Sequence, residues 1–140
     1  MLTNHKGTRL PRILLAEDDR AIARLIAIAL KRTGIPHELE TVHDGHQALD
    51  SLKKTTDLLL LDLHMPGKNG FEVLEHVKQD PLLRGIPVVV LSNSDQPADV
   101  IKAHHLYANA YVRKSPEFAV LCQTMDSLLR FWLQIAISSV

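Results

Sequence analysis

Short apolar runs alternate along this chain with longer segments in which apolar residues recur every three or four positions, and the alternation occurs five times. In the first pair, the run 13–16 precedes a segment that places Ile22, Ile26 and Leu30 on one helical face. The runs are typical of strands, and the longer segments are typical of amphipathic helices. A chain that repeats strand and helix in this order is expected to form a parallel sheet covered by helices on both faces.

The predicted elements fill the chain without a long polar linker, so we expect one domain at residues 11–140, with residues 1–10 as an N-terminal extension. Residues 57–63 include four consecutive leucines, which is typical of a central strand covered on both faces. The other strands are predicted at residues 13–16, 37–43, 87–91 and 110–113, and the helices after the first at 47–53, 71–79, 97–107 and 116–135.

Composition excludes several classes of protein. The 16 basic and 16 acidic residues cancel, so the chain has no excess of positive charge for binding nucleic acid. Cys122 is the single cysteine, which excludes a disulfide framework and a zinc finger and favours a reducing compartment. No apolar stretch resembles a signal peptide or is long enough to cross a bilayer. We expect a cytoplasmic protein that binds neither nucleic acid nor membrane.

Chemically useful side chains follow four of the predicted strands. Glu17 and Asp18 follow the first strand, Asp62 ends the third, Ser92 the fourth, and Lys114 follows the fifth. Ligands of such sheets bind beyond the carboxyl ends of the strands, so these residues are expected to converge. Clustered carboxylates favour a hard cation such as Mg²⁺. An aspartate beside Mg²⁺, with a lysine and a hydroxyl at the same edge, has the groups needed to accept a phosphoryl group.

Each of these residues also has an ordinary structural explanation. Asp19, one position further, is expected to cap the first helix. Asp62 and Ser92 could be loop or turn residues, and Lys114 could be a surface lysine. The agreement of four strand ends favours the phosphoryl-transfer site. The side chain of His64 lacks a partner at metal-binding spacing and is expected to be a plain loop histidine.

Four sequence fragments, ILLAEDD, LLLLDLHMPGKNG, PVVVLS and YVRKS, resemble in order and separation the receiver domain of bacterial two-component response regulators. The resemblance covers about residues 11–133 and implies a flavodoxin-like, CheY-like α/β fold with five parallel strands in the order 2-1-3-4-5. It also assigns a role to each residue at the strand ends. The resemblance implies that Asp62 is the phospho-acceptor. It implies that Mg²⁺ or Mn²⁺ is held by Glu17, Asp18, Asp62 and the backbone carbonyl of His64. It also implies that the phosphoryl group is bound by Ser92 and Lys114 and that Tyr111 is the aromatic switch.

Two departures from the family pattern accompany the resemblance. Many receivers have proline directly after the lysine, in a cis peptide, whereas here Ser115 follows Lys114 and Pro116 comes one position later. The isomer of the Lys114–Ser115 bond is therefore open, since a cis bond is costly without proline. His64 stands where asparagine is common, which bears on how fast the acyl phosphate hydrolyses.

A narrower resemblance concerns the stretch HELETVHDG, the pair KS in place of KP, and RFWLQ near the end. These features are similar to response regulators associated with bacterial and cyanobacterial phytochromes. They imply phosphorylation by a light-sensing histidine kinase. Because no helix-turn-helix or enzymatic domain follows, the output is expected to be a protein contact. The chain is expected to act as a phospho-acceptor with intrinsic Mg²⁺-dependent self-phosphorylation and dephosphorylation, and not as an enzyme. The downstream protein is not identifiable from the sequence.

The last predicted helix has two apolar stripes. The first, which includes Leu121, Met125 and Leu129, is expected to face the sheet, whereas Leu128, Phe131 and Ile135 form a second stripe. With the neighbouring Trp132, the second stripe predicts a homodimer through segments 97–107, 110–113 and 116–135. The alternative is that the tail folds back over its own stripe.

Three other functions are possible for a chain with a similar fold. A Mg²⁺-dependent phosphohydrolase similar to the haloacid dehalogenases needs a DxDx[TV] pattern after the first strand, and a nucleotide- or flavin-binding module needs a glycine-rich loop there. The sequence has neither pattern in that position. A phosphorylation-independent interaction scaffold stays open, although the complete carboxylate set favours phosphorylation.

Overall fold

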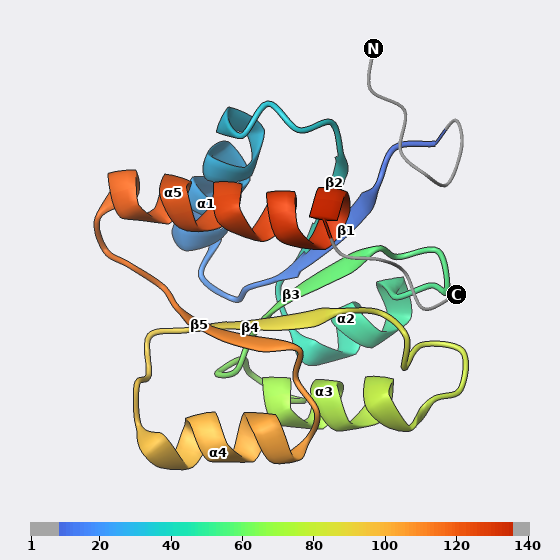
Figure 1. The fold of residues 1–140 in the computed structure, drawn as a ribbon. Coiled ribbons are helices and arrows are strands. Elements are labelled where there is room, and N and C mark those ends of the chain that lie inside the picture. Colours follow the sequence, from blue (N-terminus) through green and yellow to red (C-terminus); the bar gives the residue numbers. More distant parts are fainter. Residues whose placement is uncertain (1–8, 136–140) are drawn as a thin grey trace.

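The computed structural model describes residues 9–135 as a parallel sheet with helices on both faces (Figure 1). Its five strands stand in the order β2-β1-β3-β4-β5, as predicted. The strands are β1 (Arg12–Ala16), β2 (Glu38–Val42), β3 (Leu58–Asp62), β4 (Val88–Ser92) and β5 (Ala110–Arg113). The helices are α1 (Arg20–Arg32), α2 (Gly45–Ser51), α3 (Gly70–Gln79), α4 (Pro97–His105) and α5 (Phe118–Leu129), and α5 continues as the π-helical segment η1 (Arg130–Ile135).

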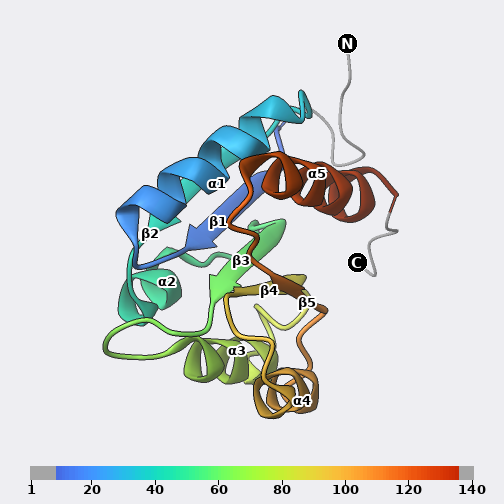
Figure 2. The same ribbon diagram turned by 90° about the vertical axis from the view of Figure 1, so that its left-hand side faces the viewer.

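The helices form two layers. Helices α1 and α5 cover one face of the sheet, and α2, α3 and α4 cover the other (Figures 1 and 2). The four leucines of β3 divide between these layers because successive side chains of a strand point to opposite faces. Leu58 and Leu60 belong to the core under α1 and α5, whereas Leu59 and Leu61 belong to the core above α2 and α3. Double coverage therefore explains the continuous apolar run.

The loops at the carboxyl edge of the sheet are fixed by helix caps. The side chain of Asp19 accepts hydrogen bonds from the backbone N–H groups of Ala21 and Ile22, which confirms its predicted capping of α1. Asn69 and Glu72 form a reciprocal capping box at the start of α3. Because these caps define where α1 and α3 begin, they also fix the short loops that leave β1 and β3.

The bounds of three helices differ from the sequence prediction. Helix α2 spans Gly45–Ser51 instead of 47–53. Helix α4 ends at His105, two residues before the predicted end, and Tyr107 adopts a left-handed backbone conformation with φ of 67°. The last helix begins at Phe118 and becomes π-helical from Arg130. A π-helix advances each residue by a smaller rotation than an α-helix, so the helical wheel fails beyond Leu129. Within residues 9–135, no helix is long and apolar enough to cross a membrane.

Candidate functional site

Three carboxylates meet at the carboxyl edge of β1 and β3. These strands are hydrogen-bonded neighbours, with Ala16 opposite Leu61, so the residues that follow β1 lie beside Asp62. Glu17, Asp18 and Asp62 each place a carboxylate oxygen within 4.8 Å of the others. Glu17 and Asp62 are buried, whereas Asp18 is exposed. The predicted convergence of the first and third strands is therefore present.

Lys114 reaches this carboxylate cluster from β5, on the far side of β4. Its backbone N–H donates to the carbonyl of Ser92, and its Nζ lies 2.6 Å from Glu17 Oε1 and 3.5 Å from Asp62 Oδ1. Lys114 is itself only 8% exposed, so water screens its charge poorly. A buried cation thus faces the acidic cluster, as expected from the strand ends.

Burial and the charges of the cluster shift the pKa of Asp62. Burial, above all, raises the pKa of Asp62 to about 7, while the Lys114 charge lowers it and the Glu17 charge raises it. The hydrogen bond to Asp18 raises the pKa further, and the backbone N–H of His64, 3.3 Å from Asp62 Oδ1, lowers it. Burial and the neighbouring carboxyl groups therefore outweigh the Lys114 charge, and an added cation would favour the ionised form of Asp62.

Ser92 and Tyr111 are joined through Ser94 in the loop between β4 and α4. The fully buried Ser92 accepts a hydrogen bond at Oγ from the backbone N–H of Ser94, at 3.0 Å. The half-buried Tyr111 donates its hydroxyl to the carbonyl of Ser94, at 2.7 Å. The serine at the strand end and the aromatic of β5 thus share one loop residue. Ser94 was missed from the sequence because its contribution is a backbone one.

A family model, the response regulator receiver domain, matches residues 13–126. The chain belongs to this family. It is 40% identical over 130 residues to the response regulator Rcp1 of Synechocystis, an alignment that covers 87% of this chain and 88% of Rcp1. The predicted family and fold are thereby confirmed.

Solved structures give the same result. The phosphorylated cyanobacterial phytochrome response regulator RcpA has a TM-score of 0.86 and 38% identity, covering 94% of this chain and all of the other. The Mn²⁺-bound form of Rcp1 has a TM-score of 0.82 and 38% identity, covering 93% of this chain and 99% of the other. Both the family and the acidic cluster of Glu17, Asp18 and Asp62 thus support the predicted divalent cation.

His64 makes one contact through its backbone and one through its side chain. Its backbone N–H contacts Asp62, as described, and its exposed side chain lies 3.6 Å from Asp99 of α4. The side chain therefore points to a helix rather than into the carboxylate cluster. The metal-ligating role of its carbonyl stays a prediction. The described residues contain no cis peptide bond, so the Lys114–Ser115 bond is trans.

The expected dimer residues differ in their surroundings. Leu128 is only 9% exposed and packs in the core cluster with Ala110 and Val112 of β5, so its predicted place on an uncovered stripe is wrong. The reason is that the Leu128 side chain belongs to the core between α5, α1 and the sheet. Phe131 is 47% exposed and packs edge-to-face on the half-buried Trp132. The side chain of Ile135 lies outside the described part of the chain.

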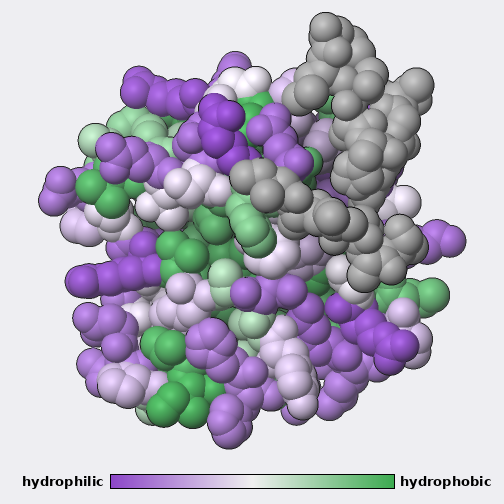
Figure 3. All heavy atoms as spheres, viewed as in Figure 1, coloured by the Kyte–Doolittle hydropathy of each residue, from purple (hydrophilic) through white to green (hydrophobic). Residues whose placement is uncertain are grey.

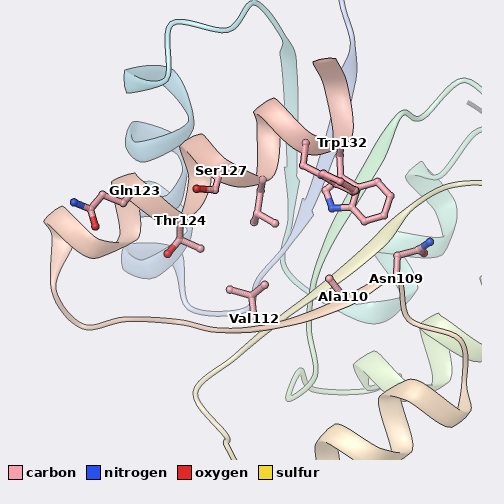
Figure 4. Close-up of a pocket in the computed structure, with 9 residues that line it drawn as sticks. Asn109, Ala110, Val112, Gln123, Thr124, Ser127 and Trp132 are labelled. Atoms are coloured by element: carbon pink, nitrogen blue, oxygen red, sulfur yellow. The ribbon is translucent and has the colours of Figure 1, made fainter. Parts of the chain in front are cut away.

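An uncharged groove of about 510 Å³ separates α5 and η1 from β5 (Figure 4). Figure 3 shows apolar side chains gathered in this hollow and, below it, over α4. The groove lining combines apolar and neutral polar side chains: Asn109, Ala110, Val112, Gln123, Thr124, Ser127, Leu128, Phe131 and Trp132. It lies away from the carboxylate cluster, on the side of the sheet edge that was expected to form the dimer.

Proposed function

We propose that Asp62 accepts a phosphoryl group from a phosphohistidine of a partner kinase. The bond between phosphorus and the histidine nitrogen breaks as a bond between phosphorus and an Asp62 carboxylate oxygen forms. The observation that carries the proposal is the position of Asp62, buried at the end of β3 within 3.5 Å of Lys114 Nζ. Lys114 would offset negative charge on the transferred oxygens, and Ser92 would donate a hydrogen bond to them.

The carboxylate cluster suits Mg²⁺, with Mn²⁺ as a substitute. Its donors are carboxylate oxygens, which hard divalent cations prefer, and a bound cation would offset the burial and the Glu17 charge that raise the pKa of Asp62. Glu17, Asp18, Asp62 and the carbonyl of His64 are the proposed ligands. When bound, Mg²⁺ would offset the charge of the phosphoryl oxygens and hold them against Asp62.

Ser94 would transmit the conformational change from the phosphorylation site to Tyr111. Movement of the Ser92 hydroxyl towards new phosphoryl oxygens breaks its hydrogen bond to the Ser94 N–H, and Tyr111 is bound to the carbonyl of the same residue. Rearrangement of this loop would therefore free Tyr111 to change rotamer and would alter the face formed by α4, β5 and α5.

The proposed kinase is a light-sensing histidine kinase of the phytochrome class. The proposal is supported by 38% identity to RcpA, whose structure is described as that of a cyanobacterial phytochrome response regulator. The output would be a contact with another protein, without binding of nucleic acid or membrane, and the receiver would not itself be an enzyme towards external substrates. A cytoplasmic location agrees with a kinase domain as phosphoryl donor.

The experiment measures Mg²⁺-dependent labelling by a phosphorylated phytochrome kinase and by acetyl phosphate. Wild type and Asp19→Asn should be labelled, because asparagine preserves the cap of α1 and Asp19 lies outside the cluster. Asp62→Asn should not be labelled. Labelling of Asp62→Asn would refute the acceptor assignment, and turnover of small phosphate esters would favour the phosphohydrolase instead. Labelling by acetyl phosphate but not by the kinase would refute only the choice of partner.

We also propose a homodimer through α4, β5 and α5. Phe131 is exposed beside the uncharged groove, so two copies related by a twofold axis could each place this ring against the other's groove. Phe131→Glu should give a monomer in light scattering at tens of micromolar. Leu25→Glu is the matched control, because Leu25 is an equally exposed apolar residue, 46% against 47%, on α1. A monomeric wild type, phosphorylated or not, would refute the dimer.

A further inference from the structure

We infer that His43 is a positioning residue for the metal site. It follows β2 in the stretch HELETVHDG, and its ring Nδ1 lies 2.9 Å from the backbone carbonyl oxygen of Glu17. A carbonyl oxygen can only accept a hydrogen bond, so Nδ1 carries the hydrogen. The inference rests on the proposed function, because it concerns how the carboxylates reach the cation.

The hydrogen bond acts on the peptide group between Glu17 and Asp18. This group is planar, so fixing the Glu17 carbonyl also fixes the nitrogen of Asp18 and the direction in which its Cα follows. The N–H of Glu17 donates to the carbonyl of Val42, at 3.0 Å, so two consecutive residues at the end of β2 hold Glu17 on both sides. Asp18 is exposed and lacks the packing that buries Glu17 and Asp62. Apart from its hydrogen bond with Asp62, its carboxylate therefore depends on the backbone for its position.

His43 is itself held in place from α2. Its backbone N–H donates to the side-chain carbonyl of Gln47, at 2.8 Å, and Asp44 caps the helix through the N–H of Gln47. The imidazole is half-buried, so water competes only partly for the Glu17 carbonyl. His43 is therefore a rigid hydrogen-bond donor on an anchored backbone. Residues of this kind, which lie outside the metal ligands and orient them, typically lower the metal affinity about tenfold or more when they are replaced.

The test measures the dissociation constant for Mg²⁺ by calorimetry on the phosphate-free protein. His43→Ala should bind Mg²⁺ about tenfold more weakly than wild type. His43→Asn should bind close to wild type, because its amide nitrogen takes the place of Nδ1. His43→Gln should bind as weakly as His43→Ala, because its amide lies one bond further out. The Asn and Gln variants keep the test valid if His43→Ala does not fold.

His37→Ala is the matched control. His37 makes the same type of bond, from Nδ1 to the carbonyl of Ile35 at 2.8 Å, but it precedes β2 at the opposite edge of the sheet. Both alanine variants should lose some stability, and only the His43 variant should lose Mg²⁺ affinity. Equal affinities for His43→Ala and His37→Ala, or for His43→Asn and His43→Gln, would overturn the inference. A wild type that binds no Mg²⁺ would refute the proposed function as well.

Discussion

Replacing Asp62 by asparagine should stabilise the metal-free protein, and by more at high pH than at low pH. The pKa of Asp62 is about 7 in the folded protein against an ordinary value of 3.8. The folded state therefore holds a proton that the unfolded state releases, and the stability associated with this proton is fully present below pH 3.8 and is lost as the pH rises through about 7. Asparagine cannot ionise, so the variant avoids this loss.

The size of the effect follows from the same pKa values. Between about pH 5 and about pH 7, roughly two pH units, the folded carboxyl keeps its proton while the unfolded carboxyl has released it, and each unit costs the wild type about 1.4 kcal/mol. The advantage of Asp62→Asn should therefore grow by up to about 3 kcal/mol across this range. With a urea m-value of about 2 kcal/mol per molar, the unfolding midpoints of wild type and Asp62→Asn should lie roughly 1.5 M further apart at the higher pH than at the lower pH.

Urea unfolding in EDTA at both pH values, for wild type and Asp62→Asn, measures this change. Taking the difference between the two proteins cancels the titration of the histidines and other shared groups. Adding Mg²⁺ at high pH should reduce the difference, because the cation stabilises the ionised wild type through Asp62. A difference between the two proteins that does not change with pH would refute the account of Asp62 as a buried carboxyl in an unbalanced cluster.

Three other substitutions test separate parts of the structure. Lys114→Met removes the charge that lowers the pKa of Asp62, so the pH dependence of labelling by acetyl phosphate should move upward, and an unchanged profile would contradict the 3.5 Å contact. Gly70→Ala places a Cβ against the backbone of Asp62 and Leu63 and should destabilise the protein by about 1–3 kcal/mol in urea unfolding. Leu60→Ala leaves a cavity under α1 and α5 and should cost about 2–5 kcal/mol, with labelling preserved below the unfolding temperature.

Much of the fold could be predicted because its signals are local. The apolar runs and the helical spacing placed all five strand–helix pairs, and the leucines of β3 indicated a strand buried on both faces. Asp19 was predicted as a cap from its position alone. The ends of α4 and α5 were harder to predict, because a left-handed residue other than glycine, Tyr107, follows α4 and a π-helical segment begins at Arg130, and both features are uncommon.

The second apolar stripe of the last helix shows where local patterns were insufficient. A helical wheel treats every residue on one side of a helix alike, and it grouped Leu128 with Phe131. In the structure Leu128 is buried in the core cluster that includes Ala110 and Val112, whereas Phe131 is exposed. The two side chains differ because Leu128 belongs to a core cluster to which the edge strand β5 also contributes, and no feature of the α5 sequence reveals that strand.

The candidate site, like the fold, could be predicted from the sequence only in part. The sequence by itself determined which side chains stand at the carboxyl ends of the strands, because a parallel sheet brings those ends to one edge. Only the tertiary structure decided that Lys114 reaches across β4 to Glu17, that Asp62 is buried deeply enough to raise its pKa, and that His43 holds the Glu17 carbonyl. Strand formation depends on neighbouring residues, whereas burial and charge balance depend on groups far apart in the chain.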